Sequence, residues 1–336
     1  MAQPLSAGAA ASVSTDLGSW RGEGVGMGQV VEALNDLRRS AQHAATRTSV
    51  VSLIVVAPDD ALANRAAEAV RALAGCHPGR TVVVVCRPGD EPRLDAEVAL
   101  HADEAQGHQV WSEDVRLWVR GPLGRHLDSL VEPLTLPDLP VVVWFTGSPP
   151  GPSEPLLGPA DAVVVDTKEP APAHLAAVAA LDHRHTVLDL AWIRLTPWRT
   201  LLAGMFEMAA LRPFLAGVHR AEVSGKPGAR LLLGGWLVSR LGLPVDAVAL
   251  APGRHAAITL HAEHEGRRAE VRVGRTEGER AVWARGDIDG RPDAEDRLAL
   301  ADDSMAWSLA EALTHLRRDR AHAQALQAAL ALAATT

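Results

Sequence analysis

The chain has 336 residues, which is enough for two domains of ordinary size. Apolar residues make up 47% of it and charged residues 22%, as is usual for a globular protein. Its formal net charge of -8 argues against a nucleic-acid-binding protein, because such proteins normally carry a basic surplus.

Hydropathy and cysteine content indicate the compartment. No apolar run approaches the roughly 18–20 residues that a membrane-spanning helix needs, and residues 1–19 lack the basic residue and apolar core of a secretory signal. Cys76 and Cys86 are too few for a disulfide scaffold, and a predicted strand separates them by roughly 20 Å. We therefore expect a cytoplasmic protein that has no membrane partner.

The N-terminal half alternates between strand and helix patterns. Residues 1–24 are small, polar and rich in glycine, and they predict a disordered N-terminal extension. An amphipathic helix follows, and then two β-branched strands flank a second helix that Asp59 caps. These four segments are residues 30–37, 49–57, 59–73 and 81–86.

A strand–helix–strand unit with uniformly apolar strands is typical of a parallel sheet covered on both faces. The alternation continues to about residue 210. The further predictions are strand 110–119, helix 122–131, strand 140–145, strand 162–166, helix 172–181 and a helix that begins at Thr196 or Thr200. We therefore predict that residues 25–211 form an α/β domain, with a mostly parallel sheet flanked by helices.

The order of elements changes near Leu211–Pro213. A strand and a helix are followed by three strands with period-2 alternation and short polar turns, which predict an antiparallel meander. These segments are residues 220–223, 229–241, 255–262, 268–273 and 280–285, and a helix capped by residues 302–304 comes next. We predict a second, α+β domain over residues 212–320, followed by a helical or frayed tail over residues 321–336.

Motifs of nucleotide binding and catalysis are incomplete in this sequence. The glycine-rich run 22–28 has Met27 where a dinucleotide loop needs its third glycine, and no strand precedes it. Gly225-Lys226 lacks the first glycine of a P-loop, and no G-x-S-x-G elbow is present. The sequence therefore offers no recognisable catalytic constellation, and we expect no bound cofactor.

Two histidine pairs are the candidate metal ligands, namely His183 with His185 and His261 with His264. A separation of three on a strand places the second pair on opposite faces, which is unsuitable for shared ligation. Neither pair has a distant cluster with recognised ligand spacing. We interpret all four as solvated or capping histidines and predict no metal site.

The densest grouping of aromatic and charged residues is the run 187–199. It contains Asp189, Trp192, Arg194, Thr196, Pro197, Trp198 and Arg199. Tryptophan and arginine are enriched where one protein anchors another, but the same residues also stack and form ion pairs inside domains. Two interpretations follow: a partner-binding surface, or the start of a helix with Trp192 packed beneath it and Arg199 paired with Asp189.

Several segments together resemble the OpcA family of glucose-6-phosphate dehydrogenase assembly proteins. The strongest are residues 134–145, 189–199 and 236–244, and the weaker ones are 77–80, 95–98 and 117–121. The resemblance implies a non-catalytic protein that binds glucose-6-phosphate dehydrogenase, promotes its assembly and activates it allosterically in the oxidative pentose phosphate pathway. It also implies a cysteine where this chain has Gly79, so we do not extend thiol-based redox control to this chain.

The candidate partner-binding residues combine the run with nearby strand ends. They are Asp189, Trp192, Arg194, Thr196, Pro197, Trp198 and Arg199, together with Asp138, Pro140 and Trp144. Two alternatives remain at this point. One is a regulatory domain that binds a sugar phosphate through its arginines, and the other is a cryptic hydrolase of the same pathway.

Overall fold

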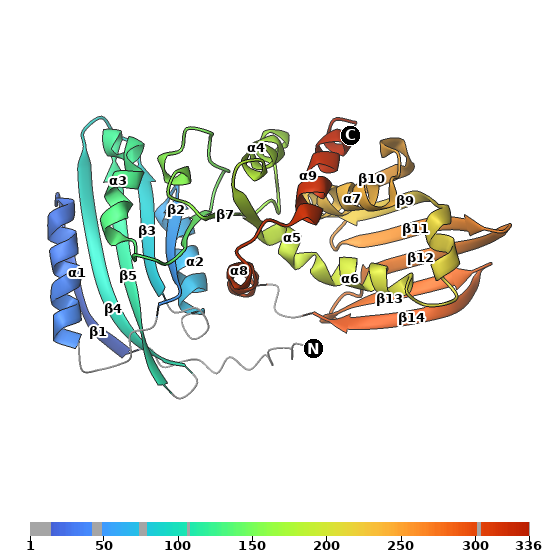
Figure 1. Cartoon of the computed structure of the whole chain (residues 1–336), viewed down its shortest axis with the longest axis horizontal. Coiled ribbons are helices and arrows are strands. Elements are labelled where there is room, and N and C mark those ends of the chain that lie inside the picture. Colours follow the sequence, from blue (N-terminus) through green and yellow to red (C-terminus); the bar gives the residue numbers. More distant parts are fainter. Residues whose placement is uncertain (1–14, 42–48, 74–78, 106–107, 301–303, 336) are drawn as a thin grey trace. The chain divides into compact units, whose positions relative to one another are not determined.

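The computed structural model describes residues 15–41, 49–73, 79–105, 108–300 and 304–335 (Figure 1). The chain forms two compact units, each assembled from three segments. The first unit comprises residues 1–165, 185–188 and 304–317, and the second comprises residues 166–184, 189–303 and 318–336. These limits differ from the predicted 25–211 and 212–320, because residues 189–211 pack with C-terminal elements that are distant in sequence.

The first unit contains an eight-stranded sheet that is mostly parallel, as predicted. In spatial order its strands are β1 (Thr15–Gly22), β4 (Arg93–Ala105), β5 (His108–Arg120), β3 (Gly79–Arg87), β2 (Val51–Ala57), β6 (Val141–Phe145), β7 (Ala162–Val165) and β8 (Thr186–Asp189). The strands from β5 to β7 pair in parallel, whereas β1, β4 and β5 pair antiparallel. The sheet therefore has a parallel centre and an antiparallel edge.

Helices cover both faces of this sheet. Its helical segments are α1 (Met27–Ala41), α2 (Asp60–Arg71), η1 (Gly121–Arg125), α3 (Leu127–Val131), η2 (Glu132–Leu134), η3 (Pro155–Leu157) and α8 (Met305–Thr314). α1 packs on β1 and β4, while α2 packs on β2, β3 and α8 (Figure 1). The predicted cap is confirmed: the Asp59 carboxylate accepts a hydrogen bond from the Leu62 amide at 2.7 Å, which satisfies one of the free donors of the first turn.

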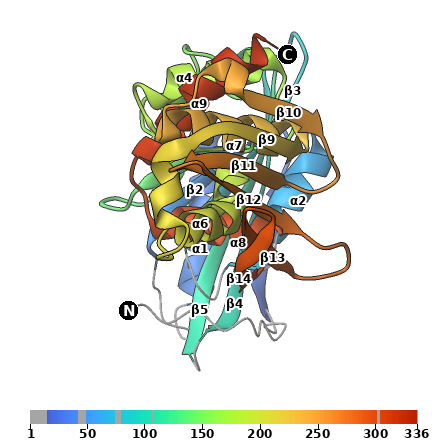
Figure 2. The same ribbon diagram turned by 90° about the vertical axis from the view of Figure 1, so that its right-hand side faces the viewer.

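The second unit contains a six-stranded sheet (Figure 2). In spatial order its strands are β10 (Val248–Pro252), β9 (Val218–Gly225), β11 (Ala257–His264), β12 (Arg267–Arg275), β13 (Ala281–Ile288) and β14 (Arg291–Ala299). β10 and β9 pair in parallel and all other neighbours pair antiparallel, which confirms the predicted meander. Gly266 and Gly290 adopt positive φ in the tight turns of this meander, as two-residue hairpins require.

The helices of the second unit pack on its sheet and on one another. They are α4 (Pro172–Asp182), α5 (Leu190–Arg194), α6 (Thr196–Met205), η4 (Arg212–Gly217), α7 (Pro227–Leu241), η5 (Val245–Ala247) and α9 (Arg320–Ala333). α6 lies on β12, β13 and β14, while α7 lies on β9 and β10 and also contacts α9. A Cβ atom at Gly235 would lie 2.1 Å from the Ala325 carbonyl oxygen, so α7 and α9 approach closely at a glycine.

One prediction is corrected by the structure. Residues 15–22, expected to be disordered, form β1, because their backbone groups pair along the length of β4; residues 1–14 lie outside the described part of the chain. Of the two predicted forms of the C-terminal tail, helical or frayed, the structure shows the helical one: Asp319 caps α9, which ends at Ala333.

Of the strands that were not predicted (β1, β4, β8, β10 and β14), two were missed for a common reason. β4 and β14 carry charged residues at many positions, and their strand pairing is not visible as an apolar pattern. Both lie in the antiparallel parts of their sheets, where one face of a strand can be solvated. Among the described residues, no helix has the length and apolar character needed to span a membrane.

Candidate functional site

The run Asp189–Arg199 forms a strand end followed by two short helices. β8 ends at Asp189, whose carboxylate accepts a hydrogen bond from the Ala191 amide at 2.9 Å and thereby caps α5. Leu195 ends α5, and α6 begins at Thr196 with Pro197 in its first turn. Proline is favourable there because the first helical amides have no intrahelical partner. Of the two predicted helix starts, Thr196 and Thr200, the structure shows Thr196.

The Asp189 carboxylate is buried within the second unit, with 2% of its surface exposed. It accepts hydrogen bonds from the backbone amide of Thr167 at 3.1 Å and from the Thr167 hydroxyl. The Nε2 atom of His322 lies 3.4 Å from Oδ2 of Asp189, without hydrogen-bond geometry. Burial by itself raises the pKa of Asp189, but His322 and Thr167 outweigh it and hold that pKa below its ordinary value.

Trp192 connects this cluster to the C-terminal helix. Its indole is 4% exposed and donates a hydrogen bond from Nε1 to Oδ2 of Asp319 at 2.7 Å. The other oxygen of Asp319 accepts from the amides of Ala321 and His322, at 2.8 and 3.2 Å, so Asp319 is also the N-cap of α9. The His322 ring contacts the indole, with centroids 5.5 Å apart. One aspartate therefore fixes both α5 and α9.

Arg199 packs over the face of the Trp192 indole. Its guanidinium carbon lies 3.3 Å from the centroid of the indole, and its Nη2 donates to the Thr196 hydroxyl at 2.9 Å. Burial lowers the pKa of Arg199 to about 10, although the negative charges of Asp319 and Asp189 oppose this. Arg199 therefore remains a cation at neutral pH. Its interaction with Asp189 is through space, whereas its direct partners are Trp192 and Thr196.

The remaining charged and aromatic members of the run also have partners inside the second unit. Trp198 is 7% exposed and donates from Nε1 to the Ala256 carbonyl oxygen at 2.8 Å. Arg194 forms an ion pair with Asp166. Burial raises the pKa of Asp166, because the attraction of Arg194 compensates for only part of the lost hydration.

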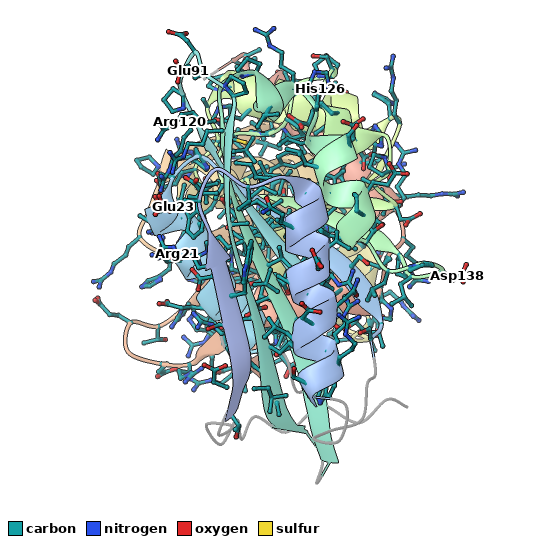
Figure 3. The ribbon with its side chains drawn as sticks, turned by 90° about the vertical axis from the view of Figure 1, so that its left-hand side faces the viewer. Arg21, Glu23, Glu91, Arg120, His126 and Asp138 are labelled. Atoms are coloured by element: carbon teal, nitrogen blue, oxygen red, sulfur yellow. The ribbon has the colours of Figure 1, made fainter. Side chains whose placement is uncertain are left out.

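The other three candidates lie in the first unit, apart from the run. Trp144 is in β6 and is 1% exposed. The Pro140 carbonyl oxygen accepts a hydrogen bond from the Ser52 amide at 2.9 Å, and so joins the loop to β2. Asp138 is exposed on a turn with a φ of 64° and points away from the unit (Figure 3). The structure therefore brings Asp189, Trp192, Thr196 and Arg199 of the run into one cluster, while Arg194 and Trp198 have other partners in the same unit.

Three members of the cluster were missed by sequence reasoning. They are Thr167, Asp319 and His322. Asp319 had a readable signal, since an aspartate directly before an alanine-rich run is typical of an N-cap. Thr167 and His322 had none, because they are 22 residues before and 133 residues after Asp189, and only folding brings them together.

The cluster is enclosed by its own members. Asp189 and His322 form a carboxylate–imidazole pair, a combination used in acid–base catalysis. Both are buried, however, with 2% and 1% of their surfaces exposed. The Trp192 indole contacts the His322 ring, and Arg199 lies over that indole. The arrangement as it stands is suited to joining α5, α6 and α9 rather than to admitting a reactant.

The two histidines of the second pair, His261 and His264, have different surroundings, as predicted for residues three positions apart on a strand. On β11, His261 lies 3.6 Å from both Glu222 and Glu270, whereas His264 packs edge-on against Phe214. Within the described ranges, no group of three or more histidine, cysteine or acidic side chains could hold a metal ion.

The thiol chemistry of the described residues is limited to Cys86, since Cys76 lies outside them. Burial, and then the nearby Glu154 carboxylate, raise the pKa of the Cys86 thiol, so it is less reactive than a free cysteine. At Gly79 an added Cβ atom would lie 2.5 Å from the Val51 carbonyl oxygen. Because that contact is with backbone, a cysteine at this position requires β2 and β3 to shift.

Two family models match the chain consecutively. Residues 70–183 match the N-terminal domain of a glucose-6-phosphate dehydrogenase subunit, and residues 185–326 match the C-terminal domain. The point between the two matches lies just before β8, in the segment where the chain passes between its two units. The family boundary therefore agrees better with the observed units than with the predicted boundary at residues 211–212.

Two cyanobacterial relatives carry the provisional name OxPP cycle protein OpcA. The protein from Synechocystis sp. is 24% identical over 193 residues, which is 54% of this chain and 41% of the relative. The protein from Synechococcus elongatus is 28% identical over 167 residues, which is 46% of this chain and 37% of the relative. The matches thus span about two fifths of each relative. With both family models matched in order, the chain belongs to the OpcA family of glucose-6-phosphate dehydrogenase assembly proteins.

Proposed function

We propose that this protein binds glucose-6-phosphate dehydrogenase, promotes its assembly and activates it allosterically without performing chemistry itself. The observation that carries the proposal is the succession of two family models over residues 70–326, which includes most of both units. The names of the two relatives place them in the OxPP cycle, which is consistent with this partner.

Activation by a binding protein has a definite thermodynamic requirement. The activator must bind the active state of the enzyme more tightly than the inactive state, and its effect cannot exceed that difference in binding free energy. Couplings of this kind are typically about 1–3 kcal/mol, which corresponds to changes of roughly 5–150-fold in affinity. We therefore expect a several-fold effect on the enzyme's apparent substrate affinity or rate.

The burial of the run divides the ten candidate residues into two groups. Asp189, Trp192 and Trp198 are interior, and Trp144 is interior to the other unit, so we propose that they act by holding the fold. Thr196 and Asp138 are exposed, and Arg194, Pro197, Arg199 and Pro140 are partly exposed. We propose that direct contact with the dehydrogenase is restricted to this second group and to other surface residues.

The test is a reconstitution with the dehydrogenase of the same organism. NADPH production is measured across glucose-6-phosphate concentrations with and without the full chain, and the mixture is analysed by sizing. A several-fold rise in rate or fall in apparent KM, with co-elution of both proteins, is expected. An indifferent enzyme that elutes separately would overturn the proposal.

Two controls separate the alternatives. If the isolated chain binds glucose 6-phosphate tightly and has no effect on the enzyme, it is a sugar-phosphate-binding domain. If the isolated chain converts a pathway lactone or phosphate ester, it is a hydrolase. Either result replaces the proposed function, because the activator is expected to need its protein partner for any measurable effect.

A further inference from the structure

Trp118 lies on the polar face of the antiparallel edge of the first unit's sheet. Along β5 the side chains alternate: Leu117 and Val119 are buried on one face, and Arg116 and Trp118 are partly exposed on the other. α1 packs against this edge of the sheet, on β1 and β4. A partly exposed indole among charged side chains points to a protein interface, because aromatic residues are enriched at such interfaces.

Three arginines surround this indole. The guanidinium carbons of Arg21, Arg116 and Arg87 lie 5.6, 5.8 and 5.9 Å from the centroid of its ring. They come from β1, β5 and β3, so the group extends across the sheet. Each distance is within the range of cation–π attraction. We call Trp118 with these three arginines the Trp118 platform.

The N-terminus of α2 holds the indole in place. The Nε1 atom of Trp118 donates to Oδ1 of Asp60 at 2.7 Å, and Oδ2 of Asp60 accepts from Arg87 at 2.7 Å. The hydrogen bond from Trp118, and then that from Arg87, lower the pKa of Asp60, so the carboxylate stays ionised. A side chain fixed before binding loses little conformational entropy when a partner covers it.

The positive charge of the platform is only partly neutralised. Arg87 pairs with Asp60, but Arg116 donates to the neutral amide oxygen of Asn64, at 2.8 Å. Among the described residues Arg21 has the indole as its partner and forms no ion pair. A guanidinium stacked on a ring leaves its N–H groups directed sideways, where they can bind a carboxylate in bidentate fashion.

The neighbouring acids do not supply that carboxylate. Arg93 pairs with Glu23 at 3.0 Å and with Asp95 at 2.8 Å. Glu97 lies opposite both Arg21 and Arg116 in the strand register, yet it forms no ion pair among the described residues. Figure 3 shows Arg21 and Glu23 at the β1 edge of the unit. Three arginines and two acids, Asp60 and Glu97, thus surround the indole, and the platform carries a small positive excess on a chain whose net charge is -8.

We propose that the Trp118 platform is the docking surface for an acidic segment of the partner protein, with Trp118 covered at its centre and Arg21 and Arg116 paired with the partner's carboxylates. This inference rests on the proposed function, in which the partner is the dehydrogenase. Tryptophan and arginine are the residues whose truncation most often costs an interface its affinity. Complementary charge also orients the encounter and raises the association rate.

The experiment measures the affinity of the full chain for the intact dehydrogenase at low and physiological salt. Three variants are compared with the wild type: Arg21→Glu/Arg116→Glu, Trp118→Ala and Arg39→Glu. The last is a matched control, because Arg39 is an exposed arginine on α1 and has no contact with the indole. Thermal unfolding of each variant verifies that it is folded.

We expect the charge reversal and Trp118→Ala each to weaken binding by at least about tenfold, and Arg39→Glu to change it less than about twofold. The charge reversal should also flatten the salt dependence of binding. If Trp118→Ala fails to fold, the charge-reversal variant alone decides, since it removes no buried group.

The outcomes separate the two proposals. If the wild type binds and the charge-reversal variant binds equally well, the docking inference is overturned and the proposed function stands. If the wild type does not bind the enzyme, both fall. A fourth measurement titrates glucose 6-phosphate into the free chain. Binding that Arg21→Glu/Arg116→Glu abolishes, with unchanged affinity for the enzyme, would make the platform a small-anion site and overturn the inference.

Discussion

Each unit contains one group of tryptophan and arginine side chains. The two groups are built from the same residue types but differ in the burial and the partners of those side chains. In the second unit, Trp192 is buried beneath the partly exposed Arg199, and its indole N–H donates to Asp319. In the first unit, the indole N–H of Trp118 is also bound by an aspartate, Asp60, but two of its arginines lack a carboxylate.

The difference shows why residue density alone does not predict an interface. The run 187–199 is the densest tryptophan–arginine segment of the chain, and its tryptophans are buried. The Trp118 platform is assembled from three strands and is therefore dispersed in the sequence. Inside a domain most buried donors are paired, whereas a surface can leave donors for a partner.

Replacing each tryptophan by alanine should separate the two groups most strongly. Trp192→Ala removes a buried indole and leaves Oδ2 of Asp319 without the hydrogen bond from that indole. We therefore expect a loss of about 3–5 kcal/mol in the free energy of unfolding of the second unit. Trp118→Ala should cost less than half of that, because its indole is partly exposed. Urea denaturation monitored by circular dichroism measures both, and equal losses would contradict the distinction between interior and surface.

Substitutions of Asp319 should reduce the free energy of unfolding by less, and by an amount that depends on the residue introduced. Asp319→Ala removes the cap of α9 and the partner of Trp192, and we expect a loss of about 1–2 kcal/mol. Asp319→Asn should recover part of it, because an asparagine oxygen still accepts hydrogen bonds at an N-cap. Denaturation midpoints of the three proteins provide the measurement. Identical midpoints for alanine and asparagine would show that charge, rather than capping, is what matters.

The smallest expected effect is a dependence on acid. The pKa values of Asp189 and Asp319 are lowered in the folded state, so the unfolded chain binds more protons near the ordinary value of 3.8. Their contribution to stability is therefore complete above that value and is lost as the pH falls below it. The stability difference between wild type and Asp319→Asn should stay constant from about pH 6 to about pH 4 and shrink below that. A constant difference would exclude this contribution of Asp319.

The apolar part of the fold was predictable from local pattern. The continuous β-branched runs of β2 and β3, the cap at Asp59 and the alternation in β11 to β13 each leave a signal within about ten residues, and each was found. β1 and β4 were not, because their strand structure depends on pairing between distant segments, such as Trp20 with Val98, which is 78 residues later in the sequence. The number and order of units also required long-range contacts.

The candidate site was predictable only as a string of residues. The sequence identified Asp189, Trp192 and Arg199 as belonging together, but it could not tell whether they face a partner or the interior. Burial decides that question for the tryptophans, and burial depends on α9, which lies more than 120 residues later. The arginines around Trp118 could not be recognised as a group from the sequence. They come from three separate strands and form no local motif.

The division of the chain has a consequence for synthesis on the ribosome. α8 completes the first unit and α9 completes the second, and both lie within residues 304–336. During translation, the nascent chain therefore carries two unfinished cores until these residues emerge. A premature stop anywhere before α8 would leave both units incomplete, and the truncated product would expose apolar surface to chaperones and proteases rather than release one folded half.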